Sequence, residues 1–443
     1  MDGPTQSIDT ILERHEMGGY RWSLYAACLI LIGLEGYDAY IVANLAPVIA
    51  RSLAVPIPSM ALVFSAQAAG MALGFYTIPV LADRIGRRGI IVTCSVLFAL
   101  LTLLSTQVGS LNAFVAVRFL AFAAFGGTLP NIVALMAEFM PESRRGKLLT
   151  WLFIGHGLGA SLAGFVGPSF VHYHSWQAAF WAGGVVLLLI TPLLFLYLPE
   201  SCRYLLVRNP RDPRIGRILA RVDPNFRAPA DATYVTAEVR SPGSPLTGLF
   251  RQGRAQLTIL LWIGMGSALC ATATFSAWLP SYLHVLGGLE TSVATRMSAV
   301  SALGAIGGPI LLTWLMGRIG LPRSLALTFC ISAIVMIGLT AVASVQWLGW
   351  VLGFGFGLLV IGSQAGLNSL VASSYPTSMR STGIGWAGGM GRLTSMVGPA
   401  IGGAILAAHW SPLAIYATIS APLLVAGLAM ATLHSIQRKA KIA

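Results

Sequence analysis

Acidic and basic side chains stand inside long apolar runs of this chain, where water is scarce. Five of them have the chemistry to hold a proton or an anion: Glu35, Asp38, Arg118, Glu138 and Arg392. If such a run crosses a bilayer, a charge at its centre costs about 2.5 to 3.5 kcal/mol on insertion scales. These groups are therefore expected to face a cavity, to pair with each other or to serve a function.

Glu35 and Asp38, in the stretch "LEGYDAY", are three residues apart and would be neighbours on one helix face. Two close carboxylates in a low dielectric resist ionising together, so one of them should hold a proton near neutral pH. The pattern predicts that Asp38 takes up and releases a proton, with Glu35 tuning it or substituting for it. In the alternative interpretation Asp38 only neutralises Arg118, which lies about 9 Å into its own run from the same side.

Arg392 is expected near the middle of its run. Its guanidinium keeps its charge and presents a planar fork that matches a carboxylate. We therefore predict that it anchors an organic anion. The alternative is that it only packs against a backbone carbonyl of a neighbouring helix.

The elements that must position these residues are helices. Of the 443 residues 56% are hydrophobic and 10% charged, whereas a soluble domain carries roughly 25% charged residues. A bilayer core of about 30 Å needs about 20 apolar residues per helix. Runs of that kind predict an all-α membrane protein with twelve spans, near 22–49, 58–81, 89–108, 111–139, 147–171, 177–199, 256–285, 293–316, 322–344, 346–373, 382–408 and 411–434.

Two short motifs recur in the second half of the chain. Asp83–Arg88 reads DRIGRR, and GRIG begins 234 residues later at Gly317. Pro141–Arg145 reads PESRR, and PTSMR begins 235 residues later at Pro376. This repetition predicts two parallel six-helix halves, with a substrate site between them. The expected divisions are an N-terminal segment 1–21, a first half 22–199, a linker loop 200–255, a second half 256–434 and a tail 435–443.

The basic residues predict the orientation. Of the 28 Lys and Arg, only Arg51 and Arg296 fall in one set of loops, so both termini are expected in the cytoplasm of a multi-pass plasma membrane protein. The net charge of +13 does not predict nucleic-acid binding, because the basic linker nearly lacks aromatic residues for base stacking. Its charge suits anionic lipid. The five cysteines lack metal-ligand spacing, and we expect no metal or cofactor.

Several stretches resemble a known family. "LADRIGRR" is similar to the signature of the major facilitator superfamily, although Pro79 stands where that signature has glycine. "EGYD", "RFLAFAAFGGTLPNIVALMAEFMPESRRG", "FSAWLPSYL" and "VIGSQAGLNSLVASSYPTSMRSTGIGWAGGMGRLTSMVGP" resemble the aromatic acid:proton symporters. That family usually has Asp at the position of Glu35. The resemblance implies the major facilitator fold, with two pseudo-symmetric halves that alternate access to a central site.

Aromatic and amide residues on the expected central helices would complete a site for a flat ligand with polar edges. The substrate-binding set is Arg392, Arg118, Tyr37, Tyr40, Asn131, Gln364, Asn368 and Trp278. Trp278 has an alternative place in the aromatic belt at the membrane surface. His156 is expected to be a hydrogen-bonded structural residue.

The resemblance also implies a latch between the halves at the cytoplasmic side, which holds the outward-open state. Its residues would be Asp83, Arg84, Gly86, Arg87, Arg88, Glu138, Arg145 and Arg380. The second copy of the motif has Gly317 where the acid would stand, so we expect the latch on one side. For Arg87 and Arg88 the alternative is a cluster that only sets topology.

These patterns predict a monomeric, proton-coupled importer of an aromatic carboxylate of hydroxybenzoate type, and no enzyme. Two alternatives stay open: a proton antiporter that exports organic acids or drugs, and a receptor that binds a carboxylate without moving it. The sequence leaves the particular acid open, because one hydroxyl or methylene changes pocket contacts by only about 1 to 3 kcal/mol.

Overall fold

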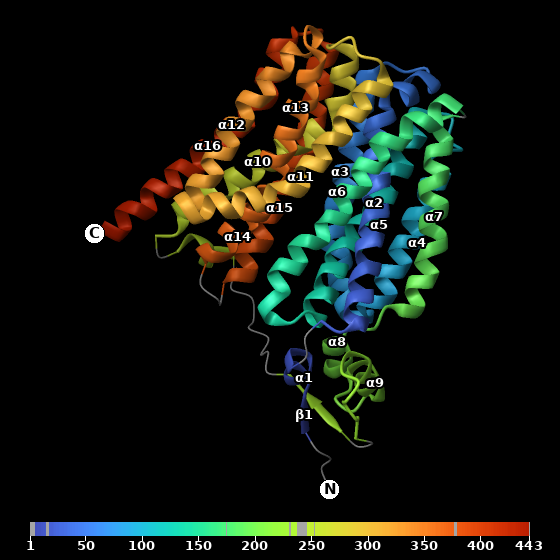
Figure 1. Cartoon of the computed structure of the whole chain (residues 1–443), viewed down its shortest axis with the longest axis vertical. Coiled ribbons are helices and arrows are strands. Elements are labelled where there is room, and N and C mark those ends of the chain that lie inside the picture. Colours follow the sequence, from blue (N-terminus) through green and yellow to red (C-terminus); the bar gives the residue numbers. More distant parts are fainter. Residues whose placement is uncertain are drawn as a thin grey trace.

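Two bundles of long helices make up most of the molecule, and a small third unit lies at one end (Figure 1). The computed structural model describes residues 5–14, 17–173, 175–229, 232–236, 246–251, 253–375 and 379–442. The first bundle contains α2 (Gly19–Ser52), α3 (Met60–Ile85), α4 (Arg87–Leu104), α5 (Leu111–Phe139), α6 (Glu142–Tyr173) and α7 (Trp176–Tyr197). The second contains α10 (Ala255–Val285), α11 (Thr291–Ile319), α12 (Leu321–Gly338), α13 (Gln346–Phe356), α14 (Gln364–Ser374), α15 (Arg380–Ala407) and α16 (Pro412–Ile442).

The helices confirm the predicted architecture. Eleven spans within the described residues are long and apolar enough to cross a membrane, and one of them is α13 and α14 together with the π turn that joins them, Gly357–Ile361. α15, which has 28 residues and contacts α3 and α10, completes the twelve. Each predicted span overlaps an observed helix, or a helix continued by a 3-10 or π segment for 322–344 and 346–373, although α16 runs eight residues beyond its predicted end at 434.

Small residues let these helices approach closely. A Cβ on Gly159 of α6 would lie 1.8 Å from the carbonyl oxygen of Gly33 in α2, so any larger residue would push the two backbones apart. The seam between the halves is built in the same way, because a Cβ on Gly164 of α6 would lie 2.5 Å from Cβ of Ala299 in α11. Backbone packing of this kind is a main source of helix association in lipid.

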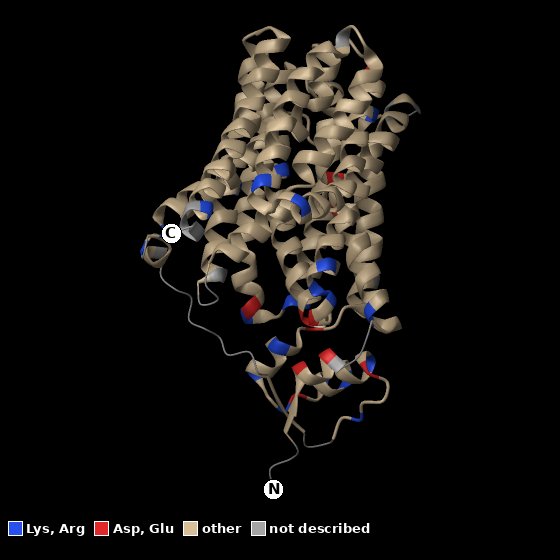
Figure 2. Cartoon of the chain, turned by 60° about the vertical axis from the view of Figure 1, so that its left-hand side comes forward, with Lys and Arg blue, Asp and Glu red and all other residues tan. Residues whose placement is uncertain are grey.

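Charged residues are distributed unevenly along the bundle. They gather at the end that holds the N-terminus and are sparse over the rest of the helices (Figure 2). We call this the charged end and the other the uncharged end. The ribbons of the two halves lie close together at the uncharged end and diverge toward the charged end (Figure 1).

The third unit differs from the predicted linker loop. Part of the stretch 200–255 folds into α8 (Cys202–Arg208), α9 (Pro213–Val222) and β2 (Thr233–Val235). β2 pairs in parallel with β1 (Thr5–Ser7), which is followed by α1 (Ile8–Arg14). We call these five elements the cap. Their apolar residues, such as Ile8, Leu205 and Leu219, belong to the same buried cluster as the core of the first half, so the cap is an extension of that half.

Candidate functional site

A buried ion pair joins α2 and α5. Nη2 of Arg118 lies 2.7 Å from Oδ2 of Asp38, and both side chains are almost fully buried. With its amide oxygen facing the guanidinium, Gln67 of α3 accepts from Nη2 at 3.1 Å and from Nε at 3.2 Å. The rings of Phe122 and Phe180 lie 5.1 and 5.6 Å from the guanidinium carbon. The contact that the sequence suggested is present, and it gives each charge the partners that burial demands.

Glu35 has different partners. It is fully buried, and its Oε1 accepts from Oγ of Ser95 in α4 at 3.5 Å. Its Oε2 has no hydrogen-bond partner among the described residues. Three positions along a helix turn a side chain by about 60°, and here that rotation directs the two acids to different neighbours. The structure therefore does not unite Glu35 and Asp38 in one pair.

Arg392 lies about 18 Å along α15 from its first residue, near the middle of this 28-residue helix. Its guanidinium carbon is 3.4 Å from the ring centroid of Phe75 in α3, a cation–π contact between the two halves. Nη1 makes a long contact of 3.5 Å with the carbonyl oxygen of Gly388. Nε is buried and has no hydrogen-bond partner, and no acid pairs with this arginine within the described ranges. A partly buried cation with a buried, open donor is a site that an anion can complete.

Gln364 begins α14, directly beyond the π turn, and α14 contacts α15. Its Nε2 is a second buried donor without a partner in the described structure. π turns inside membrane helices often mark functional positions, because they interrupt the regular ladder of hydrogen bonds. Asn368, one turn further along α14, is exposed. The structure thus supports a polar role for Gln364 more than for Asn368.

A third group of predicted residues meets where α2, α6 and α10 converge. The hydroxyl of Tyr40 lies 3.5 Å from Oγ of Ser276 in α10 and so links the halves. The ring of Tyr40 meets the ring of His156 edge-on at 5.7 Å, and Phe125 stacks on the same imidazole at 6.2 Å. Nδ1 of His156 has no hydrogen-bond partner among the described residues, so the expected hydrogen-bonded role is not seen at that nitrogen.

Two residues that were predicted to bind substrate form hydrogen bonds within their own half instead. Tyr37 donates its hydroxyl to the carbonyl oxygen of Ala179 in α7 at 3.0 Å and is buried. Asn131 donates from Nδ2 to the carbonyl oxygen of Gly127, one turn earlier in α5, at 2.7 Å. Neither contact brings the residue to Arg392.

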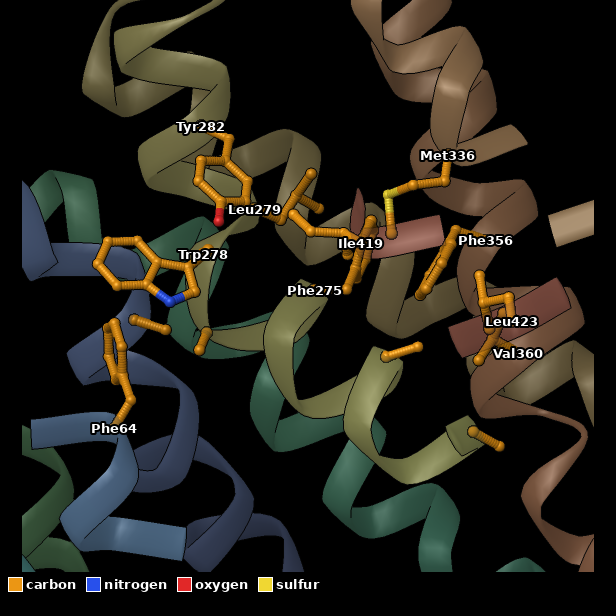
Figure 3. Close-up of a cluster of buried hydrophobic side chains, with 14 of the residues drawn as sticks. Phe64, Phe275, Trp278, Leu279, Tyr282, Met336, Phe356, Val360, Ile419 and Leu423 are labelled. Carbon is orange, nitrogen blue, oxygen red and sulfur yellow. The ribbon is translucent and has the colours of Figure 1, made fainter. Parts of the chain in front are cut away.

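Trp278 is fully buried, so the alternative that placed it in an aromatic belt is wrong. Its ring meets Phe64 of the first half edge-on at 5.3 Å, and Figure 3 shows the two side chains directed toward each other. Nε1 donates to the carbonyl oxygen of Pro399 at 2.9 Å. Thr295 donates to the carbonyl oxygen of Asn44 across the same seam at 3.1 Å. The Phe64–Trp278 and Asn44–Thr295 contacts close the halves together toward the uncharged end.

The core of the predicted latch lies within the first half. Arg87 pairs with the buried carboxylate of Glu138, and its Nη2 lies 3.5 Å from Oδ1 of Asp83. Glu138 also accepts from Oγ of Ser201 at 2.7 Å, and Oε1 of Glu200 accepts from the backbone N–H of Arg87 at 2.8 Å. The carboxylates therefore bind the segment that leads into the cap.

The other latch residues have separate roles. Gly86 has a φ of +104°, and a Cβ there would lie 2.5 Å from Oε2 of Glu200. Arg88 donates from Nη2 to the carbonyl oxygen of Phe195 at 2.6 Å. Nε of Arg145 makes a 3.4 Å contact with the carbonyl oxygen of Met140. Arg84 lines a hollow beside the cap, and the side chain of Arg380 lies outside the described residues.

Sequence reasoning missed Phe75, Gln67 and Ser201. Phe75 is one of 19 phenylalanines and Gln67 sits in an ordinary apolar run, so nothing in the sequence marks either one. Ser201 had a usable signal, because it follows "LPE" and starts a short helix whose Tyr204 N–H it accepts.

Comparison with known proteins identifies relatives over nearly the whole chain. The family model described as Major Facilitator Superfamily matches residues 28–393. The gallate transporter of Pseudomonas putida is 28% identical over 97% of this chain and 95% of its own length. The 3-(3-hydroxy-phenyl)propionate transporter of Escherichia coli is 30% identical over 92% of this chain and 93% of its own.

Solved structures share the fold at lower identity. The nucleoside transporter NupG matches with a TM-score of 0.71 at 14% identity, over 94% of this chain and all of that one. A bacterial homolog of the lysosomal transporter Spinster, solved in an inward-facing and unoccupied conformation, matches with a TM-score of 0.67 at 14% identity over 94% and 95% of the two chains.

Proposed function

The chain belongs to the major facilitator superfamily, among its aromatic acid transporters, and from this premise we propose that it imports a hydroxybenzoate-like carboxylate together with a proton. It is a multi-pass membrane transporter and not an enzyme. The coupling, the direction and the site are our proposal. The relatives support the substrate class, since their names include gallate, 4-hydroxybenzoate and hydroxyphenylpropionate transporters.

The observation that carries the proposal is the state of Arg392. Its guanidinium lies on the Phe75 ring, and it has an open buried donor and no acidic partner within the described residues. A substrate carboxylate would receive the planar fork, while an aromatic ring suits the adjoining Phe75 and Tyr76. Gln364 offers a second donor for a polar edge of the ring.

Asp38 is the proposed proton carrier. In this conformation its carboxylate is paired with the guanidinium of Arg118. A proton arriving on Asp38 removes the charge that holds Arg118, and the pair opens as the halves rock about the central site. Glu35 can then tune the pair only from a distance, because its hydrogen bond goes to Ser95.

The proposed orientation places the charged end in the cytoplasm, with both termini there and the protein in the bacterial inner membrane. The distribution of charge in Figure 2 supports this by the positive-inside rule. The contacts of Trp278 with Phe64 and of Thr295 with Asn44 then close the outer side, which is the arrangement of an inward-facing transporter.

Uptake of labelled 4-hydroxybenzoate, gallate and benzoate into cells, with and without an uncoupler, tests the proposal. Arg392→Ala should abolish uptake and binding, while Asp38→Asn should keep counterflow and lose accumulation against a gradient. The matched control is Arg318→Gln, an exposed arginine of the same half that lies over Trp314. Accumulation by Asp38→Asn equal to that of the unaltered protein would sink the coupling assignment.

Vesicles that contain the purified protein separate the alternatives. An inward proton gradient drives uptake by a symporter and efflux by an antiporter. A receptor would bind the acid and raise the thermal midpoint without any counterflow of labelled ligand.

A further inference from the structure

A basic hollow of about 520 Å³ lies where the cap meets the charged end of the first half. It is bounded by the end of α3, the start of α4, all of α8 and the residue that follows β2. Its lining residues are Asp83, Arg84, Arg87, Ser201, Arg203, Tyr204, Val207, Arg208 and Thr236. Four arginines and one acid therefore face the same space.

Two of the four arginines already have carboxylate partners. Arg87 is paired with Glu138, and Nη2 of Arg203 lies 3.8 Å from Oδ1 of Asp9 in α1. The other two differ. Arg208 donates to the hydroxyl of Tyr204 at 2.6 Å and has no acidic partner in the described part of the chain. Arg84 likewise has no ion pair or hydrogen bond within the described residues.

The backbone N–H groups at the start of α4 are not available to an anion in the hollow. The first amides of α4, at Arg87 and Arg88, donate to Oε1 of Glu200 at 2.8 and 3.2 Å. A ligand in the hollow would thus be held by side chains: the guanidinium groups of Arg84 and Arg208, the second of which also donates to the hydroxyl of Tyr204. Guanidinium groups match the oxygens of phosphate with two parallel hydrogen bonds, and two of them suit an anion with several oxygens.

We infer that the basic hollow binds a phosphate-type oxyanion, either the headgroup of an anionic phospholipid or free phosphate, and that the occupant ties the cap to the bundle. Arg84 belongs to α3 and Arg208 to α8, so one anion held by both would bridge the two units. The rim of the hollow suits a lipid headgroup better than free phosphate, because it exposes apolar side chains. Val207 in the lining is 69% exposed, and Ile85, next to Arg84, is 56% exposed. Exposed apolar residues beside arginines suit the boundary between headgroup and acyl chain.

The test measures thermal unfolding of the purified full-length protein. In neutral detergent, inorganic phosphate is compared with chloride at equal ionic strength. In nanodiscs, phosphatidylglycerol is compared with phosphatidylcholine. The variants are Arg84→Gln/Arg208→Gln and, as the matched control, Arg318→Gln, which occupies the repeat-related place in the half that lacks a cap.

A ligand that binds only the folded protein raises its midpoint by mass action, and we expect a rise of about 3 °C in the unaltered protein and the control. The double variant should show none. A rise with phosphate in detergent would identify free phosphate, and one with phosphatidylglycerol alone would identify the lipid. No rise with either, or an equal rise in the double variant, overturns the inference.

A second readout covers the case in which the double variant does not fold. Native mass spectrometry of Arg84→Gln and Arg208→Gln singly counts the phosphatidylglycerol or phosphate that stays bound. Each single variant should retain less than Arg318→Gln does. Equal retention in all three contradicts the inference. Neither readout involves transport, so failure here leaves the proposed function untouched, and failure of the uptake test leaves this inference standing.

Discussion

Two arginines of this protein, the fully buried Arg118 and the partly buried Arg392, are in opposite situations. Arg118 has a carboxylate at 2.7 Å, an amide oxygen from Gln67 and no exposed surface. Arg392 has an aromatic ring, one long contact to a carbonyl and an Nε without a partner in the described chain. The first site is electrostatically complete and the second is not. An incomplete site of this kind is tolerated because the aromatic ring and the helix backbone partly compensate the charge. Binding of an anion would stabilise it further.

The two arginines also lie in different halves of the molecule. The completed pair lies inside the first half, which also carries the latch carboxylates and the cap. The open arginine lies in the second half and reaches the first through Phe75. Under the proposed function, proton chemistry and anion recognition would be held on different helices, and rocking of the halves would couple them.

The largest effect is expected from Arg118→Ala. Removal of this cation leaves Asp38 as a buried unpaired charge, which should lower the free energy of unfolding by about 3 to 5 kcal/mol. Thermal or denaturant unfolding in detergent measures the loss. The double variant Asp38→Asn/Arg118→Gln should recover part of it, and the exposed Arg296→Gln should stay within about 0.5 kcal/mol of the unaltered protein. A loss below about 1 kcal/mol would mean that the pair is not complete in the resting protein.

Arg392→Lys should leave stability nearly unchanged and weaken carboxylate binding. Lysine keeps the charge but lacks the planar fork and stacks less well on Phe75, so one charge-assisted hydrogen bond of about 1.5 to 3 kcal/mol is lost. This corresponds to an increase in Kd of about 10- to 150-fold. Equilibrium binding of 4-hydroxybenzoate measures it, with Arg318→Lys as the control. Unchanged affinity would show that only the charge of Arg392 matters.

The sequence was sufficient to predict the helices but not to predict the fold of the cap. Twelve apolar runs dictate twelve helices because lipid permits little else, and depth along the helices already suggested Asp38 beside Arg118. The strands of the cap have three residues each and pair Thr5 with Thr233, a contact with no local signal. Glu35 and Tyr37 could not be assigned neighbours from periodicity alone, because that requires knowing which helix lies on each side of α2.

A smaller effect is expected from Gln364→Met, and it should have opposite signs in two measurements. Loss of a buried donor without a partner should stabilise the empty protein by up to about 1 kcal/mol. The same change should weaken 4-hydroxybenzoate binding by about 3- to 10-fold if Gln364 donates to the ring hydroxyl, and leave benzoate unaffected. Gln346→Met, at the exposed start of α13, is the matched control. Equal weakening of the binding of both acids would show that Gln364 contacts the carboxylate and not the hydroxyl.

The smallest effect concerns a paired arginine outside the membrane. Asp212 accepts from the backbone N–H of Arg214 at 2.9 Å at the start of α9, and Nη2 of Arg214 lies 2.7 Å from its Oδ2. The Arg214 hydrogen bond holds the pKa of Asp212 below its usual value, although burial opposes the shift. A lowered folded-state pKa gives stability above the unfolded value, about 3.9, which is lost as the pH falls through the folded value.

Asp212→Ala should therefore weaken the cap by about 1 kcal/mol, mainly through the lost helix cap, because an ion pair whose arginine is 55% exposed contributes little. Limited proteolysis between α9 and β2 at pH 7 measures the opening of this unit. Asp212→Asn keeps a capping side chain without the charge and should be cleaved nearly as slowly as the unaltered protein. If Asn behaves like Ala, the charge of the pair matters even in water, and the contrast between buried and exposed arginine pairs is weaker than proposed here.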